Sequence, residues 1–153
     1  MRDTWYYDVL LFIHIASAIT AVGANITYGV WFGRVARDVA HLGFVLRTVK
    51  FLDDRIANPA YGVLFLSGLV MVAIGQWGIK LWIVVAVILF VAIAVIGFAV
   101  FTPLANRQIA LVDSGQVDSA EFAGLSRRSR VIGPALGLLV LLILAMMIFK
   151  PGS

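Results

Sequence analysis

Four long stretches without a charged side chain constrain this chain more than any other feature. They cover about residues 8–33, 56–75, 81–104 and 131–149, and none has an Asp, Glu, Lys or Arg in its interior. Because about 20 apolar residues in a helix cross a hydrocarbon core about 30 Å thick, each stretch can span a membrane. The sequence therefore predicts an all-α fold, a polytopic membrane four-helix bundle in which residues 1–153 form a single membrane domain.

The composition excludes an ordinary water-soluble domain. Of the 153 residues, 62% are hydrophobic and 13% are charged, whereas a soluble domain is about 45–50% apolar and about 25% charged. The absence of cysteine excludes disulfides and thiolate chemistry. No basic run is interleaved with aromatic residues, so we expect no nucleic acid partner. The partners expected from the net charge of +4 are the lipid bilayer and, at the basic loops, anionic lipid.

The distribution of Lys and Arg predicts the orientation in the membrane. The loops of residues 34–56 and 105–130 together hold nine of the 12 basic residues, and the other three lie on the opposite side. The positive-inside rule therefore predicts a multi-pass protein of the cell membrane, with both long loops cytoplasmic and both termini outside. Apolar residues at helical spacing predict that the first loop extends a span or lies on the membrane surface as a helix. Asp118 or Ser119 could cap a short helix in the second loop.

The two halves of the chain resemble each other. Arg55–Leu64 reads RIANPAYGVL and Arg130–Leu139 reads RVIGPALGLL, so that five of ten positions match, and Val30–Ala40 resembles Val100–Ala110. We interpret this as two tandem two-helix repeats in the same orientation, covering about residues 8–75 and 81–149. Such repeats are related by a pseudo-two-fold axis along the membrane normal.

The matching segments suggest a motif at the start of the second and fourth spans. An arginine at the interface prevents the span from sliding inward, a proline is tolerated in the first helical turn, and a glycine permits close helix approach. This span-start motif consists of Arg55, Pro59 and Gly62, repeated as Arg130, Pro134 and Gly137.

The first span is the polar one, and it supplies the candidate site. Its polar residues recur every three or four positions and share one helix face, which we expect to face the bundle interior; they are His14, Ser17, Asn25 and Tyr28. Asn25 lies near mid-membrane, where it could clamp a neighbouring helix or hydrogen-bond a ligand.

His14 is the most informative of these residues. A neutral imidazole can ligate haem iron, shuttle a proton or simply bond to a neighbouring helix. Met71 and Met146 approach the same depth from the same side, so a His/Met haem site formed by His14 with either methionine is geometrically possible. His14 is also the candidate metal ligand. Bis-His ligation is not available because His41 lies in a loop, and three span methionines are few for a copper site.

The first span also carries a family resemblance. The segment LLFIHIASAITAVGANITYGVWF, together with Arg55, Pro59 and Gly62, resembles a bacterial family of predicted four-helix integral membrane proteins of unknown function. More remotely, the His-then-Gly first span is similar to copper-resistance D-type membrane domains and to four-helix membrane protoporphyrinogen oxidases. Those resemblances imply copper handling and haem-linked redox chemistry, and only His14 can be carried over from them.

Three functions are compatible with these features. The first is a small integral membrane protein of unknown activity that binds haem or another porphyrin through His14. The alternative is a partner subunit or scaffold in a membrane complex, as a homo-oligomer or with another membrane protein. The third is a small transporter, suggested by the internal duplication. The sequence has no Ser–His–Asp set, phosphate loop or carboxylate cluster, which favours a protein that is not an enzyme.

Overall fold

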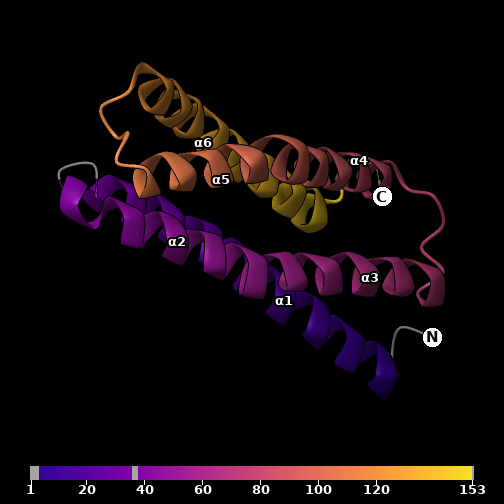
Figure 1. The fold of residues 1–153 in the computed structure, drawn as a ribbon. Coiled ribbons are helices and arrows are strands. Elements are labelled where there is room, and N and C mark those ends of the chain that lie inside the picture. The colour runs from indigo at the N-terminus through magenta and orange to yellow at the C-terminus, as the bar shows by residue number, and fades with distance from the viewer. Residues whose placement is uncertain (1–3, 36–37, 153) are drawn as a thin grey trace.

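The computed structural model describes residues 4–35 and 38–152, and the described residues form helices and turns without a strand. Four helices are long and apolar enough to cross a membrane: 5–35, 39–74, 81–113 and 120–149. The prediction of an all-α protein with four membrane-crossing helices is thus confirmed. In chain order (Figure 1) the elements are α1 (Trp5–Val35), η1 (Val39–His41), α2 (Leu42–Leu52), η2 (Asp53–Ala57), α3 (Asn58–Ile74), α4 (Leu81–Ile96), η3 (Gly97–Phe101), α5 (Thr102–Asp113) and α6 (Ala120–Phe149).

The helices pack as two pairs (Figure 1). In the first half, α1 lies along α3, and in the second half α4 lies along α6. The helices α2 and α5 continue α3 and α4 beyond these pairs and pack against each other. Both chain ends and the turn between α3 and α4 lie at one end of the bundle, and the other two connections lie at the opposite end.

The two central long helices each pass a proline by means of a π turn. Proline has no N–H, and its ring clashes with the carbonyl four residues earlier in an α-helix. A π turn shifts the hydrogen bond by one residue, so Asn58 N–H donates to the Asp53 carbonyl before Pro59, and Thr102 N–H donates to the Gly97 carbonyl before Pro103. The helix therefore continues past each proline. The first basic loop is an extension of the second span, which was one of its two predicted forms.

The fourth long helix departs from the predicted motif. Ser119 caps it, because its Oγ accepts from Phe122 N–H at 3.1 Å, but the capped helix is not short. It continues through Phe149, so Pro134 lies inside α6 and not in a first turn. The prediction for Pro134 was wrong because the apolar stretch marked where the span begins and not where the helix begins. Pro59 does lie in the first turn of α3.

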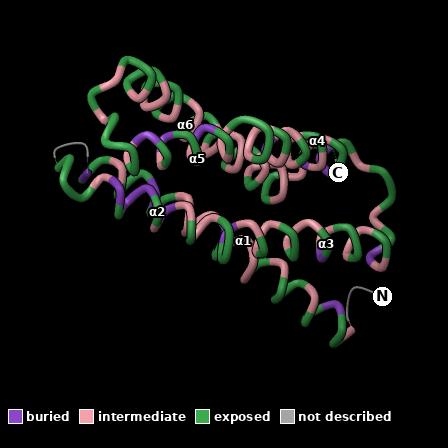
Figure 2. The backbone as a smooth tube through the Cα atoms, in the orientation of Figure 1, coloured by how far each residue is buried: buried purple, intermediate pink, exposed green. Residues whose placement is uncertain are grey.

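Buried residues are few, and they concentrate where α2 and α5 meet (Figure 2). A hydrophobic cluster of the first half consists of Tyr28, Val35, Val45, Val49 and Ala57. Elsewhere the helices present large apolar side chains outward, such as Phe12, which is 72% exposed. Such a surface suits a helix surrounded by lipid and would aggregate in water.

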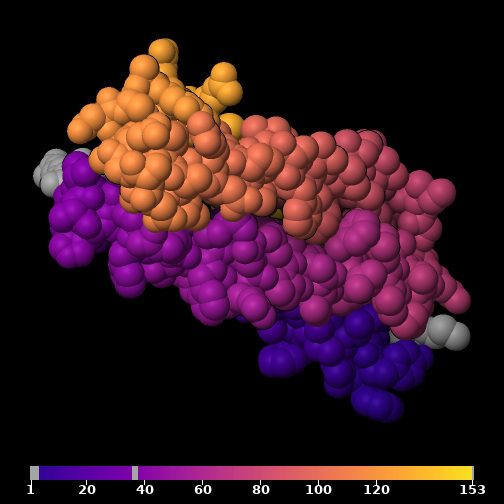
Figure 3. All heavy atoms as spheres, in the orientation of Figure 1, coloured from indigo at the N-terminus to yellow at the C-terminus, as the bar shows by residue number. Residues whose placement is uncertain are grey.

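Contacts at both ends of the bundle join the two halves. At the α2–α5 end, Leu46 and Leu111 are buried and Arg47 Nη1 lies 2.6 Å from Asp113 Oδ1; the two segments meet along the face shown in Figure 3. At the other end, Trp77 Nε1 donates to the Tyr7 hydroxyl at 3.2 Å. There the Lys150 ammonium also lies over the rings of Trp77 and Trp82, at 4.8 and 5.7 Å from their centres.

Candidate functional site

The polar face of α1 lies against α3, as the helical spacing predicted. Ala21 is fully buried and Tyr28 is nearly so, whereas Ile19 and Ile26 on the opposite face are exposed. The polar side chains of this face meet partners on α3. We call this contact the α1–α3 seam, and it is the candidate site.

His14 bonds to Ser67 at the end of the seam nearer the start of α1. His14 Nδ1 lies 3.0 Å from Ser67 Oγ, and the Ser67 hydroxyl donates to the Val63 carbonyl of its own helix at 2.7 Å. Because the hydroxyl proton is directed at Val63, we assign His14 Nδ1–H as the donor to Ser67 Oγ. This tautomer leaves His14 Nε2 as a hydrogen-bond acceptor.

Gly68 provides the room for this contact. A Cβ atom added at Gly68 would lie 3.0 Å from His14 Cε1 and 3.5 Å from His14 Nδ1. A side chain at this position would therefore have to displace the imidazole of His14. Ser67 and Gly68, which the sequence analysis did not single out, are the two residues of α3 that seat His14. Two adjacent small residues within an apolar span, one of them polar, were the signal that could have identified them.

Asn25 bonds to Tyr61 further along the same seam. Asn25 Nδ2 donates to the Tyr61 hydroxyl at 2.7 Å and to the Ala21 carbonyl at 2.9 Å. The Tyr61 ring in turn meets Phe90 of α4 edge to face at 6.1 Å between ring centres. Asn25 thus clamps α1 to α3 in this structure, which is one of the two roles predicted for it. Tyr61 extends the contact to the second half.

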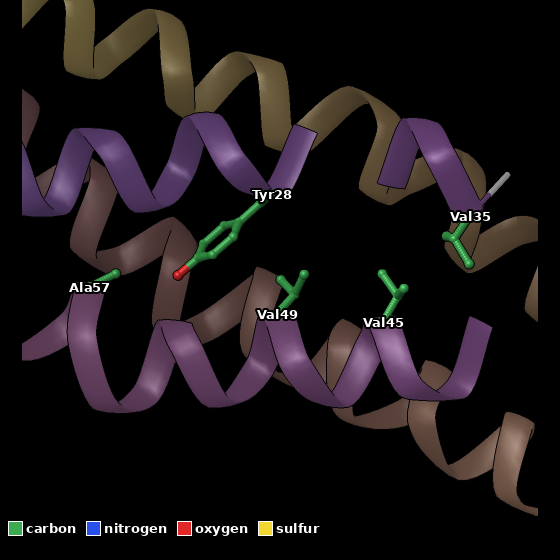
Figure 4. Close-up of a cluster of buried hydrophobic side chains, with 5 residues drawn as sticks. All are labelled: Tyr28, Val35, Val45, Val49 and Ala57. Carbon is green, nitrogen blue, oxygen red and sulfur yellow. The ribbon is translucent and has the colours of Figure 1, made fainter. Parts of the chain in front are cut away.

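Tyr28 closes the other end of the seam, near the end of α1. Its side chain points from α1 toward the helix that contains Ala57 and Val49 (Figure 4). Among the described residues, the Tyr28 hydroxyl and Trp82 Nε1 are the buried side-chain polar atoms without a hydrogen-bond partner. Of the fully buried side-chain polar atoms that the structure describes along the seam, the Tyr28 hydroxyl is therefore the one without a partner in the protein.

Charged residues follow Tyr28 at the π turn of the second long helix. Lys50 pairs with Asp54 one turn later, and Asn58 Nδ2 donates to Asp53 Oδ2 at 3.4 Å. Asp53 precedes the predicted span 56–75. Its burial, and after that the neighbouring Asp54 carboxylate, raise the pKa of the Asp53 carboxyl above its usual range. The seam therefore ends on a partly desolvated carboxyl group at the edge of the apolar stretch.

In the described part of the chain, no hydrogen bond joins His14 to Met71 or Met146, the other two predicted cofactor ligands, or to Ser17, a predicted packing or ligand residue. Ser17 is half-buried on α1, and Met71 follows Ser67 by one turn of α3. Met146 is half-buried on α6, in the other half of the molecule. Residues 4–35 and 38–152 contain no group of three or more His, Cys, Asp or Glu side chains that could hold a metal ion. The His14 haem site thus stays a prediction.

The glycines of the span-start motif do not mediate close packing. A Cβ at Gly62 or at Gly137 would meet no atom within 4 Å, so their predicted role in helix approach is wrong. The glycines at close contacts are others. Gly68 faces His14, and a Cβ at Gly43 would lie 2.9 Å from Val112 Cγ1. A repeated glycine marks sequence similarity, whereas the contact depends on which side of the helix faces a neighbour.

The second half has its own polar cluster, but outside its apolar stretches. The buried Gln108 donates from Nε2 to Ser126 Oγ at 3.1 Å and accepts from Ser129 Oγ at 3.0 Å. Beside it, Arg107 donates to both carboxylate oxygens of Glu121 at 2.6 and 2.9 Å. This cluster ties α5 to the first turns of α6, and no spacing in the sequence predicted it.

A family model described as a predicted integral membrane protein (DUF2269) matches residues 8–151. The match covers nearly the whole chain, including the seam and both long connections, and its description names no activity or ligand. No curated protein and no solved structure matches the chain. The remoter likeness to copper-resistance D-type domains and protoporphyrinogen oxidases stays a prediction.

Proposed function

The chain belongs to the DUF2269 family of predicted integral membrane proteins, and on that premise we propose that it serves as a non-catalytic partner or scaffold subunit of a membrane complex. One observation carries this proposal. His14 and Asn25, the two strongest ligand candidates in the spans, both use polar atoms to bind α3. Interhelical hydrogen bonds of this kind fix the register of helices in lipid.

The outer face of α1 is the surface that we propose for the partner. Phe12, Ile19 and Ile26 recur every seven residues there and are 72%, 68% and 66% exposed. Gly29 and Gly33 continue the same side of the helix, and a Cβ at either position would meet no atom within 4 Å. A face with large apolar residues and a Gly-x-x-x-Gly pair is typical of helices that associate within membranes. The clamps hold α1 by its other face and leave this one available.

Site-specific photo-crosslinking in native membranes tests the partner role. A photo-reactive residue at Ile19 should give a discrete adduct of higher mass, either with a second copy or with another membrane protein. The matched control is the same residue at Phe98 of the second half, which is 65% exposed at a comparable apolar position. Adducts with lipid alone at both positions would refute the partner role.

A second candidate function is the binding of haem or another porphyrin at His14, and it also has a specific observation in its favour. A ligating histidine normally donates its other ring N–H to a fixed partner, and the His14–Ser67 bond has that form. Met71 lies on the same helix as Ser67, one turn beyond it, whereas Met146 lies on α6. This candidate is second because the same bond equally serves a structural clamp.

An absorption titration separates the two candidates. The purified chain in detergent is mixed with haem, and the Soret band is compared between the native chain, His14→Ala and the control Thr20→Ala, whose hydroxyl bonds only to Ala16 of its own helix. The scaffold role predicts the same weak, unsaturated uptake for all three. Saturable one-to-one binding that His14→Ala abolishes and Thr20→Ala retains would establish the haem site.

We further propose that both termini lie outside the cell membrane and both long connections lie in the cytoplasm. The bias of Lys and Arg supports this orientation. Cysteine labelling tests it, since the chain has no native cysteine. A cysteine at Ser114 should resist an impermeant maleimide in intact cells, and one at Gly152 should react. The reverse pattern would invert the proposed topology.

A further inference from the structure

A groove lies between the π turn with the start of α5 and the first turns of α6. It has a volume of about 320 Å³. Its floor is apolar and consists of Val100, Pro103, Leu104 and Leu125. Its rim is basic and consists of Arg107 and Arg128. The groove belongs to the second half of the molecule and is separate from the α1–α3 seam.

A second, shallow and open groove adjoins Arg128 on the surface of α6 itself. It has a volume of about 490 Å³, and Arg127, Arg128, Val131 and Ile132 line it. Arg128 therefore borders both apolar hollows. Three guanidinium groups, those of Arg107, Arg127 and Arg128, thus border two adjoining apolar grooves. This arrangement matches the plan of an anionic phospholipid, in which one phosphate joins two acyl chains.

The charges of this region favour an anionic occupant. Within the described residues, Arg127, Arg128 and Arg130 have no carboxylate within ion-pairing distance, and no Asp or Glu follows Glu121 in the chain. Arg107 does have a partner, because it pairs with Glu121. Arg128 is thus the rim residue whose charge is available to a ligand.

The depth of the groove fits the boundary between headgroups and hydrocarbon. Leu104 closes the predicted span 81–104, and Val131 opens the predicted span 131–149. Arg107 and Arg128 each lie three residues outside these limits, about one helical turn. Guanidinium groups at the depth of the lipid headgroups, with apolar residues at the depth of the acyl chains, complement a phospholipid along its length.

We propose that the groove pair around Arg128 is a binding site for an anionic phospholipid. Arg128 holds the phosphate, Arg107 borders it, and the acyl chains lie along the apolar floors of the two grooves. This inference rests on the placement of the apolar helices in the bilayer and is independent of the partner and haem roles of the first half. A bound lipid here would seal the crevice between α5 and α6 at the membrane edge.

Native mass spectrometry of the full chain in detergent measures this binding directly, with phosphatidylglycerol and phosphatidylcholine of the same chain length as probes. We expect phosphatidylglycerol to bind more tightly, with one preferred site. Arg128→Gln should weaken it about fivefold, which corresponds to about 1 kcal/mol for one basic residue at a membrane surface. The matched control Arg34→Gln removes the same charge at the end of α1, where it lines neither groove, and should leave the affinity unchanged.

Two further arms keep the proposal open to refutation if Arg128→Gln misfolds. Leu125→Trp fills the groove without changing charge and should also weaken phosphatidylglycerol binding. Soluble glycerol phosphate should not compete at lipid concentrations, because it lacks acyl chains; effective competition would indicate a site for a soluble anion. Equal losses for Arg128→Gln and Arg34→Gln, or equal binding of the two lipids, would show diffuse surface charge only and overturn the site.

Discussion

The α1–α3 seam and the α4–α6 contact are built on different principles. Two hydrogen bonds between side chains, His14–Ser67 and Asn25–Tyr61, cross the first contact at membrane depth. Among the residues that the structure describes, no side-chain hydrogen bond joins α4 to α6. The buried residues of α4 are Trp82, Ile83, Ala86 and Ile93, and the polar ties of the second half lie on α5 and the first turns of α6.

The predicted repeat makes the contrast sharper. When the alignment of the second and fourth spans is continued without gaps, Tyr61 aligns with Leu136 and Ser67 aligns with Leu142. When the first span is aligned with the third in the same way, His14 aligns with Val84 and Asn25 aligns with Val95. Each clamp residue of the first half thus has an apolar counterpart in the second half.

The difference teaches where specificity lies in such a bundle. Lipid tails are as apolar as Leu or Val, so hydrophobic burial gives little preference for one helix register over another inside the bilayer. Polar pairs do give such a preference, because a misplaced partner leaves a polar group in hydrocarbon. We therefore expect the first half to be held at one register within the membrane, and the second half to be fixed mainly from its ends.

The largest expected effect is a difference in stability between substitutions of two glycines, one in each half. Gly68→Leu forces His14 off α3, because even a Cβ there would lie 3.0 Å from the imidazole. We expect overpacking of this kind to cost about 1–3 kcal/mol in the free energy of unfolding. Denaturation in mixed detergent micelles, followed by circular dichroism, measures it.

Gly137→Leu is the matched control, since a Cβ at Gly137 would meet no atom within 4 Å. It should leave stability unchanged or raise it by up to about 1 kcal/mol, because Leu has the higher helix propensity. Equal destabilisation by both variants would contradict the contrast between the two halves.

A double-mutant cycle compares polar coupling in the two halves. For Asn25→Leu with Tyr61→Phe we expect a coupling energy of about 0.6 kcal/mol, and at most about 1.7, as is usual between membrane helices. The matched cycle, Gln108→Leu with Ser129→Ala, tests the cluster outside the apolar stretches. Its coupling should be smaller because Ser129 is only half-buried and lies outside the predicted spans, so water can replace its bond to the buried Gln108. A larger coupling energy at Gln108 than at Asn25 would show that the polar contact that fixes the helix register lies in the second half.

The smallest effect is expected at the exposed pair Arg107–Glu121. The hydrogen bonds from Arg107 hold the pKa of Glu121 below its usual range. The folded-state pKa is therefore below the unfolded value, so the stabilisation is present at neutral pH and is lost as the pH falls through the folded value. Because both side chains are exposed, Glu121→Gln should change stability only slightly at neutral pH and not at all in acid.

Unfolding curves from neutral pH to about pH 3, at low salt and at about 1 M salt, measure this difference. The small effect should disappear in high salt as well as in acid. A large, salt-resistant effect would show that this pair, and not packing along α4 and α6, holds the second half together.

The sequence located the candidate site on α1 but not its partners. Helical spacing alone placed His14, Asn25 and Tyr28 on one inward face, since spacing along a helix determines which side chains share a side. It could not identify Ser67, Gly68 or Tyr61, because the rotation and vertical offset of α3 relative to α1 are not encoded in either segment alone. The same limit explains why Gly62 and Gly137 were given a packing role that they do not have.

The sequence by itself determined the number of membrane-crossing helices. The length and charge content of an apolar stretch are local properties, and they can be compared directly with the thickness of the bilayer. The sequence also determined the polar face of α1. Only the tertiary structure decided that the long helices pass Pro59 and Pro103 through π turns, that α6 begins at Ala120, and which glycines lie at contacts. The π turns and the cap of α6 depend on how hydrogen bonds are redistributed within each folded helix, and the glycine contacts depend on which helix sides meet, which is set by neighbours distant in the chain.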